Sequence, residues 1–352
     1  MKSEILKLLR EAEDYISGQE LCDKFTVSRT AVWKVINQLK EDGYSIEAVR
    51  NKGYRMIDSP DVLNREAVES HVGSKSLGCQ VVCFDVIDST NIQAKVLAEQ
   101  GCPHGMLVVA DQQVSGKGRR GRTWESPKAS AISMSLVLRP TFAPNRAPML
   151  TLIMAYSVAK AMLKYEHAKW NVQIKWPNDI VVNGKKVCGI LTEMSTEVDY
   201  INYVVIGVGI NANMTEFPEE LENIATSLKL ESLEPIMADE QAEKLTEESS
   251  DARISTNYII QRAKLIGMIL EEFEVQYEQF CEMGDLSFLQ EGYNELLVNR
   301  DKEVKVLEPG NEYKAFARGI DSEGQLEVCL ESGEVKSVYA GEVSVRGLYG
   351  YV

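Results

Sequence analysis

The chain has 352 residues, which is too long for one ordinary hydrophobic core and predicts two or three domains. It contains 53 acidic and 38 basic residues, and the net charge of -15 excludes nucleic-acid binding over the whole surface, because an acidic field repels phosphate. Any contact with DNA must therefore be local.

The cysteine and histidine content bounds the class of protein further. Seven scattered cysteines without a Cys-x-x-Cys pair, and only three histidines, disfavour a disulfide framework and a structural metal site, so we expect no metal-ligating residues. No apolar run approaches the roughly 20 residues that span a membrane, and the first residues lack the apolar core of a signal peptide. We therefore expect a cytoplasmic protein without membrane contact.

Residues 1–60 have the pattern of a winged helix-turn-helix. Apolar residues at helical spacing from Ile5 to Ala12 predict one helix, and Ser17 to Glu20 form a capping box that begins a second. Ser28 is placed to cap a third helix, whose apolar stripe leaves its polar residues outward. Two short runs joined by residues 50–53 then predict a hairpin, which is the wing.

The third helix and the hairpin turn carry the predicted DNA contacts. Between Thr26 and Lys40 there are three cations and no acid, although acids predominate in the chain. The residues expected to contact DNA are Ser28, Arg29, Thr30, Lys34, Asn37, Arg50 and Lys52. A small helical module that docks a protein partner is the alternative for this segment.

The central region, residues 61–290, holds a polar turn after a predicted strand over Val81 to Val86. The strand ends in Asp88-Ser89-Thr90-Asn91, and a helical pattern follows. Hydroxyls and free N–H groups at a helix N-terminus can hold a polar small molecule. A plain helix cap is the alternative for these residues.

A basic, glycine-rich segment follows a second predicted strand over residues 107–110, which delivers Gln113 to it. Residues 116–122 pack three glycines and four cations into seven positions. Such a loop can approach a ligand closely and hold anionic oxygens with guanidinium groups, whereas a solvated linker is the alternative. Trp124 follows and is placed to stack on a flat ring.

Two further segments complete the predicted site. Lys175-Trp176-Pro177-Asn178-Asp179 fixes one lysine beside an aromatic residue and a turn. A buried strand over residues 204–210 carries Gly207 and Gly209, which indicate either close approach of a ligand or backbone, or core packing.

The last part of the chain contains an insert and a small β domain. Residues 231–256 are polar, acid-rich and without periodicity, which predicts an inserted loop before a closing helix. Short alternating runs separated by glycine turns over residues 295–352 predict a small antiparallel barrel. The fold class is therefore α+β with several domains.

In this order, the segments resemble the bifunctional biotin-protein ligases that double as biotin operon repressors. The resemblance covers nearly the full length and includes Gly207-Val208-Gly209-Ile210-Asn211. It implies a class II synthetase-like mixed sheet at the centre and an SH3-like barrel at the end. The acidic insert, which the family generally lacks, and Lys117, where some members carry arginine, depart from the pattern.

The resemblance implies an enzyme that makes biotinyl-5'-AMP from biotin and ATP and transfers biotin to a lysine of a biotin carrier protein. It assigns biotin binding to Ser89, Thr90, Asn91, Gln113, Lys117, Gly118, Arg119 and Lys175. It assigns ATP and adenylate binding to Arg119, Arg120, Arg122, Trp124, Lys175, Asn178, Asp179 and Asn211. Lys175 and Arg119 would be catalytic, since cations fixed where charge develops lower the barrier.

The same resemblance implies Mg²⁺ with ATP and a homodimer that binds operator DNA when it holds the adenylate. Three alternatives stay open from the residues themselves. They are a ligase whose winged helix no longer regulates transcription, a lipoate-type acyl-protein ligase, and a sensor that binds biotin and DNA without catalysis.

Overall fold

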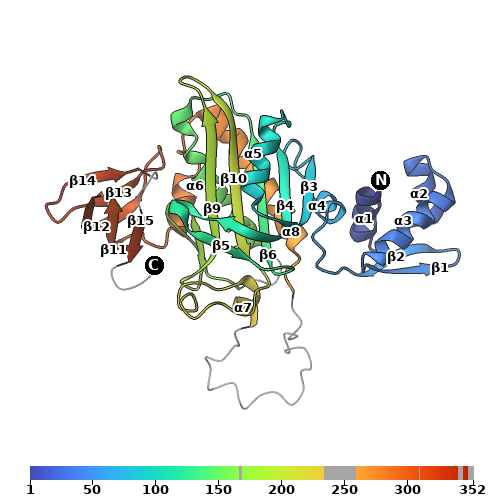
Figure 1. The fold of residues 1–352 in the computed structure, drawn as a ribbon. Coiled ribbons are helices and arrows are strands. Elements are labelled where there is room, and N and C mark those ends of the chain that lie inside the picture. The colour runs from blue at the N-terminus through green and yellow to red at the C-terminus, as the bar shows by residue number, and fades with distance from the viewer. Residues whose placement is uncertain (166–168, 234–258, 309, 340–343, 348–352) are drawn as a thin grey trace, which may run out of the picture.

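The structure is a computed structural model that describes residues 1–165, 169–233, 259–308, 310–339 and 344–347. Figure 1 shows three parts in a row, with the N-terminal helices and hairpin on one side of a large central sheet and a small β domain on the other. The mixed α+β class predicted from the sequence is confirmed. Among the described helices, none combines the length and apolar character needed to cross a bilayer.

The N-terminal part is a winged helix-turn-helix with the predicted caps. Ser17 Oγ accepts a hydrogen bond from Glu20 N at 3.0 Å, and Ser28 Oγ accepts one from Ala31 N at 3.2 Å. These bonds satisfy N–H groups that a helix leaves free at its start. The elements are α1 (Lys2–Glu11), α2 (Gly18–Phe25), α3 (Arg29–Glu41), β1 (Ser45–Val49) and β2 (Gly53–Asp58).

The central part is one mixed sheet with the strand order β3-β4-β6-β10-β9-β8-β7, and β5 pairs with β4 outside this order. Only the β3–β4 pair is parallel among the described strand pairs of this sheet. The strands are β3 (Val81–Ile87), β4 (Met106–Lys117), β5 (Thr123–Ser126), β6 (Ala131–Leu138), β7 (Val172–Lys175), β8 (Asp179–Val182), β9 (Lys185–Thr196) and β10 (Ile201–Asn211).

Helices cover the two faces of this sheet unequally. Alternating residues of a strand point to opposite faces, so Val205 packs on the side of α5 (Thr90–Glu99), whereas Val204 and Ile206 join the larger core under α6 (Met149–Lys164) and α8 (Arg262–Met283). The remaining helical elements are α4 (Arg65–His71), α7 (Leu228–Leu233), α9 (Gln290–Leu296) and the 3₁₀ turns η1 (Arg119–Gly121) and η2 (Pro144–Arg146).

The C-terminal part is a five-stranded antiparallel sheet with the order β14-β13-β12-β11-β15. Four of its strands coincide with the predicted alternating runs. Its strands are β11 (Lys302–Glu308), β12 (Asn311–Ile320), β13 (Leu326–Cys329), β14 (Val335–Val338) and β15 (Ser344–Gly347).

The structure differs from the sequence-based expectation in two segments and in several short elements. Strand β4 continues to Lys117 and pairs with β5, so the basic segment begins inside a strand pair rather than in a free loop. Residues 231–233 complete α7, where a loop is predicted, because Glu231 accepts a hydrogen bond from Thr226 Oγ1 at 2.6 Å. The rest of the predicted insert lies outside the described residues. The short elements α4, α9, β5 and β15 are not predicted.

The head, residues 1–58, contacts the central part through α1 and α4. Arg10 Nη1 donates to Ser70 Oγ at 2.9 Å, and Lys2 Nζ lies 2.8 Å from Asp42 and 3.9 Å from Glu66. His71 lies in the same junction, where burial and then the charges of Arg10 and Lys264 lower its pKa to about 3.

This pKa makes the stability of the junction depend on pH. Below the ordinary histidine pKa of 6.5, His71 is protonated in the unfolded chain but stays neutral in the folded protein. The stability of the folded state therefore falls as the pH falls. We expect this residue to cost the wild type about 2 kcal/mol of unfolding free energy between about pH 8 and about pH 5.

Urea unfolding of His71→Gln at both pH values measures this effect. The variant should lose less stability on acidification than the wild type by that amount. Equal losses in the two proteins would mean that His71 titrates normally in the folded state.

Candidate active site

A cavity lies on the α5 side of the central sheet, where the start of α5 meets β4, β9 and β10. It encloses about 460 Å³ of space, part of it open to solvent. The predicted site residues that line it are Ser89, Thr90, Asn91, Gln113, Lys117, Gly118, Arg119, Trp124 and Asn178. Gly207 and Gly209 line it as well, so four segments far apart in the sequence meet here.

A buried hydrogen-bond network forms the polar floor of the cavity. Gln113 Oε1 accepts from Thr90 N at 2.8 Å, and Ser135 Oγ lies 2.8 Å from Thr90 Oγ1 and 2.6 Å from Asn91 Oδ1. Asn91 Nδ2 donates to Glu193 Oε2 at 2.8 Å. These bonds fix the direction of each amide, so the floor presents a defined set of donors and acceptors.

Glu193 is held as an anion behind this floor. Burial acts to raise its pKa, but hydrogen bonds from Lys95 and Asn91 outweigh burial, and the pKa of Glu193 lies below its usual value. Lys95 Nζ lies 2.8 Å from Glu193 Oε1. The charge that orients Asn91 is therefore itself compensated.

Ser89 precedes α5 without capping it. Its side chain is only 2% exposed and makes no capping bond to the helix in the described part of the chain. The backbone N–H of Ser89 instead donates to Asp88 Oδ1 at 2.7 Å. The Ser89 side chain therefore does not act as a plain helix cap, and the residue lines the cavity.

Gly207 and Gly209 make room for two side chains of the cavity. A Cβ atom at Gly207 would lie 2.0 Å from Asn91 Oδ1, and one at Gly209 would lie 2.5 Å from Trp124 Cε2. Any other residue would displace these groups. The approach is thus made by side chains of the site itself, rather than by the second backbone that the sequence left open.

Trp124 covers the far side of the cavity from this floor. Among the described residues, its buried Nε1 has no hydrogen-bond partner, which is unusual for a buried N–H group. Lys186 Nζ lies 5.5 Å from the centre of the indole ring and 2.6 Å from Asp179 Oδ1. The ring therefore has a cation on one face.

Arg119 is the one arginine of the basic segment that lines the cavity. Its Nη1 donates to Asn178 Oδ1 at 2.7 Å, and burial lowers its pKa. Gly118 N donates to Arg122 O at 2.7 Å and closes the turn. Arg120 has a φ of 59° and points to a neighbouring hollow beside Pro148 and Pro177, whereas Arg122 is exposed.

Three predicted residues stand behind the cavity wall rather than on it. Lys175 is 4% exposed at the end of β7, opposite Asp179 in the β7–β8 pair, and is not among the described lining residues. Asp179 accepts from Lys186, and Asn211 Nδ2 donates to Thr226 O at 3.0 Å. Asn178, which links this group to the cavity, donates to Ile190 O at 3.1 Å.

Sequence reasoning missed Lys186, Ser135 and Glu193. Lys186 has the pattern of a hairpin turn, and only the pairing of β8 with β9 brings it to Trp124. Ser135 and Glu193 lie inside strands whose alternation gives no sign of a site. Knowledge of the strand register would have found all three, because register brings Lys186 to the cavity wall and sets Ser135 and Glu193 in hydrogen-bond contact with Asn91 of the floor.

The predicted DNA contacts lie on α3 and the wing of the head. Arg29, Thr30 and Lys34 are exposed, and Arg29 Nη2 donates to Gln19 Oε1 at 2.9 Å. Lys52 is exposed on the hairpin turn with its Nζ 5.4 Å from the ring of Tyr15. Of the other predicted contacts, Ser28 caps α3, Asn37 is half-buried and Arg50 is exposed.

Trp33 was not predicted as a contact. Its side chain is 56% exposed on α3, between Arg29 and Lys34 on the outward part of the helix. An exposed tryptophan on this helix is a large apolar surface beside two cations, and such rings pack against partners.

Three family models match the chain in order. They are an HTH domain over residues 2–55, the Biotin/lipoate A/B protein ligase family over residues 83–211, and the Biotin protein ligase C terminal domain over residues 301–346. A ligase-type sheet joined to a helix-turn-helix head and a small end domain is thus the class that the fold and cavity define.

Proteins with this complete organisation are similar over the full length. The chain is 36% identical over 351 residues to the bifunctional ligase/repressor BirA of Bacillus subtilis, with 98% of both chains covered. It is 28% identical over 344 residues to that of Escherichia coli, with 97% of this chain and 96% of the relative covered. The chain belongs to the family of bifunctional ligase/repressors.

A solved structure shares most of this fold. The biotin protein ligase from Aquifex aeolicus, in complex with biotin and ATP, superposes with a TM-score of 0.60 at 25% identity. The match covers 76% of this chain and 99% of that chain.

The close packing of Trp124 on β10 generates a prediction for Gly209. Gly209→Ala should push the indole away from the sheet, because the added Cβ atom meets the ring at 2.5 Å. Acrylamide quenching of tryptophan fluorescence should rise in this variant. The rise should vanish in the double variant with Trp124→Phe, which identifies the ring responsible.

Gly101→Ala is the control, since a Cβ atom there meets nothing within 4 Å although its φ of 84° carries a backbone cost. Unchanged quenching in Gly209→Ala would show that the ring does not lie against β10.

Proposed function

We propose that the protein is an ATP-dependent ligase that makes biotinyl-5'-AMP and transfers biotin to a specific lysine of a biotin carrier protein. We propose further that it represses transcription of biotin genes as a DNA-binding dimer. One observation carries the proposal: a polar floor, a half-buried arginine and an indole ring line a single cavity in a chain similar over its full length to bifunctional ligase/repressors.

The polar floor fits the ureido end of biotin. Ser89, Thr90 and Asn91 offer hydroxyl and amide groups from the start of α5, and Gln113 faces them from β4. A ureido group has both donors and a carbonyl acceptor, so it needs a mixed set of partners like this one. Lys117, Gly118 and Arg119 would close over the biotin carboxylate from the basic segment.

The chemistry requires two anions to react with each other. A carboxylate oxygen of biotin attacks the α-phosphorus of ATP, and pyrophosphate leaves; the acceptor lysine amine then attacks the acyl carbon, and AMP leaves. Arg119 and Lys175 would stabilise the charge that builds up between the carboxylate and the α-phosphate. Fixing both substrates on one sheet also removes the entropic cost of their encounter.

The adenine end is assigned to the covered side of the cavity. Trp124 would stack on the base, with its unpartnered Nε1 available to an acceptor, and Asn211 would contact the ring from the end of β10. Asn178 and Asp179 would support the nucleotide from the turn after Lys175. Arg120 and Arg122 are exposed, and they would reach the phosphates only after the basic segment folds over the nucleotide.

Mg²⁺ would arrive as part of the ATP substrate. The described residues hold no group of three histidine, cysteine, aspartate or glutamate side chains that could cage a metal. The ion would therefore be held mainly by phosphate oxygens and water, which is how Mg²⁺ commonly binds with nucleotides.

We place the protein in the cytoplasm, where biotin carriers and operator DNA are both accessible.

Biotinylation of a biotin-carrier domain tests the catalytic proposal directly. The protein should transfer biotin to the carrier in the presence of ATP and biotin. Lipoate in place of biotin serves as the second arm, because a lipoate-type ligase would share the fold. Transfer of lipoate in preference to biotin would overturn the assignment.

Lys175→Ala should slow adenylate formation by roughly a hundredfold or more, because the ammonium acts on charge present mainly in the transition state. Single-turnover synthesis of biotinyl-5'-AMP measures this step apart from transfer. Lys128→Ala removes an exposed lysine outside the cavity and is the matched control. A near-normal rate in the Lys175 variant would remove this residue from the mechanism.

The repressor proposal predicts dimeric binding to a two-fold symmetric operator, tightened by biotin and ATP. One recognition helix covers too few bases for specificity, so two copies are needed. Lys34→Ala should weaken binding and reduce its dependence on salt, because a phosphate contact is lost. Lys7→Ala, on α1, is the control.

Titration of labelled DNA with and without biotin and ATP measures both effects. Equal affinity in the two conditions would separate the DNA-binding head from biotin sensing.

A further inference from the structure

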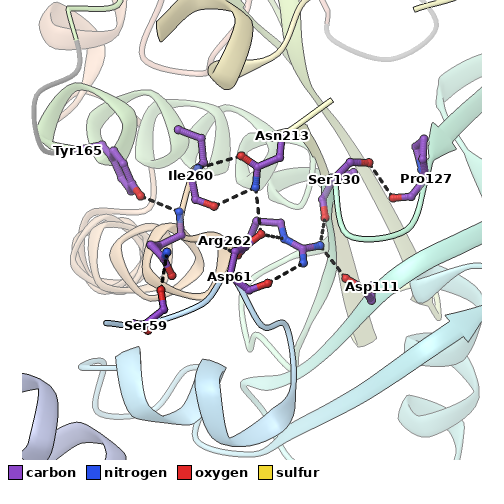
Figure 2. A network of polar contacts seen from close by, with 11 residues as sticks. Ser59, Asp61, Asp111, Pro127, Ser130, Tyr165, Asn213, Ile260 and Arg262 are labelled. Carbon is purple, nitrogen blue, oxygen red and sulfur yellow. Dashed lines mark hydrogen bonds and ion pairs between the residues drawn. The ribbon is translucent and has the colours of Figure 1, made fainter. Parts of the chain in front are cut away.

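Arg262 is the first residue of α8 and lies at the centre of a buried network of charges (Figure 2). Its side chain is 1% exposed, and its Nε lies 2.6 Å from Asp61 Oδ2 while its Nη1 lies 2.7 Å from Asp111 Oδ1. The same Nη1 donates to Ala131 O at 3.1 Å, and Arg262 N donates to Asp61 Oδ1 at 2.9 Å. One guanidinium therefore holds two carboxylates and a carbonyl.

Two of these partners belong to strands that carry the cavity. Asp111 lies in β4, two residues before Gln113 of the polar floor. Ala131 is the first residue of β6 and pairs with Asn211, the last residue of β10. The guanidinium is thus bonded to β4, which bears Gln113, and to β6 beside the end of β10, which bears Gly207 and Gly209.

The third partner belongs to the connection between the head and the central part. Asp61 follows β2, the last strand of the head, by three residues. Gln261 Nε2 donates to Ser59 O at 3.1 Å, so the residue before Arg262 holds the same connection. Figure 2 shows Ser59 and Asp61 on this segment beside the start of α8.

Asn213, just after the end of β10, completes the network. It follows Asn211 by two residues, and its Nδ2 donates to Asp61 Oδ2 and to Ile260 O, each at 3.0 Å. Its Oδ1 accepts from Ile260 N at 2.8 Å. The segment after β10, the start of α8 and the head connection are therefore joined by side-chain hydrogen bonds.

The energetics indicate that this network fixes the positions of its partners rather than adding to the stability of the fold. Burial raises the pKa of Asp61 even though Arg262 pairs with it, so desolvation costs more than the pairing returns there. A planar guanidinium binds in fixed directions, so a shift of one carboxylate forces the others to follow or breaks a bond. The guanidinium therefore passes a displacement of one partner on to the others more effectively than it stabilises the fold.

We propose that Arg262 is a positioning residue that couples occupancy of the ligand cavity to the placement of the DNA-binding head. The proposal rests on the proposed function, and it adds the physical route by which that function is regulated. A ligand bound to Gln113 and the basic segment restrains β4 and with it Asp111. Through Arg262 this sets Asp61 and the connection to the head.

Isosteric and conservative variants separate this role from a merely structural one. Asp111→Asn keeps the shape and one neutral hydrogen bond to Arg262 but removes the charge that ties β4 to it. Arg262→Lys keeps the charge but removes the planar guanidinium that bonds several partners at once. Glu274→Gln is the matched control, because Glu274 is a buried carboxylate on α8 that accepts from Lys75 N, Ser76 N and Leu77 N and has no link to the cavity.

Hydrogen–deuterium exchange of the full chain, with and without biotin and ATP, provides the first readout. In the wild type and Glu274→Gln, ligands should slow exchange at residues 89–91 and 113–118 and also at residues 59–63. In Asp111→Asn and Arg262→Lys, the cavity segments should still respond while residues 59–63 no longer do. A purely structural role would not separate the two responses.

Operator binding provides the second readout. The ratio of affinities with and without biotin and ATP should be about tenfold or more in the wild type and fall to about threefold or less in both coupling variants. Single-turnover adenylate synthesis should change little. Retention of the full ratio and of the response at residues 59–63 in Asp111→Asn would overturn the proposal, as would loss of the cavity response itself.

Different results would refute the proposed function and the coupling role of Arg262. A wild type that makes no biotinyl-5'-AMP would refute the ligase proposal. A wild type that makes it but shows no ligand-dependent operator binding would refute the repressor proposal, and the exchange experiment would still decide on Arg262. Should Arg262→Lys not fold, Asp111→Asn decides alone, since it preserves volume and hydrogen bonding.

Discussion

The site depends on two glycines that leave one face of β10 without side chains. Gly207 and Gly209 lie on the face toward α5, and the space that they leave is taken by Asn91 and Trp124. A single methyl group at either position would overlap one of these side chains, and tightly packed interiors do not absorb such overlap without strain. The polar floor and the indole ring can therefore line one cavity only because β10 has glycines at these two positions.

Charge is distributed so that a strongly acidic chain still presents cations where anions would bind. These cations lie in the basic segment, at Lys186 beside Trp124 and on the outward face of α3. Arg119 is partly buried and held by Asn178, which limits its screening by solvent and salt. Local placement, rather than net charge, thus determines what the protein can bind.

Much of the fold follows from local sequence rules. The caps at Ser17 and Ser28, the hairpin of the head and the alternating strands of the end domain depend on neighbouring residues, so their sequence patterns predicted them. Nine predicted residues do line one cavity, because strand ends and helix starts are visible in sequence. Lys175 and Asn211 were placed in the right region but behind the wall, since side-chain direction depends on packing between distant strands.

What sequence patterns could not supply is long-range register. Lys186 approaches Trp124 only through the β8–β9 pairing, and Arg262 meets Asp61 across 201 residues of chain. Arginine at the start of a helix ordinarily indicates an exposed side chain, and burial against two carboxylates has no local signature. Such contacts are decided by tertiary structure alone.

The unequal covering of the central sheet has a consequence for how the protein can change during evolution. The large core under α6 and α8 lies on the face away from the cavity, whereas only a small cluster that includes Ala94, Ala98 and Val205 supports the ligand side. Substitutions in the large core should chiefly alter the melting temperature. Substitutions in the small cluster act directly beneath α5, so they are the more direct route by which a descendant of this chain would acquire a different acyl substrate without losing its fold.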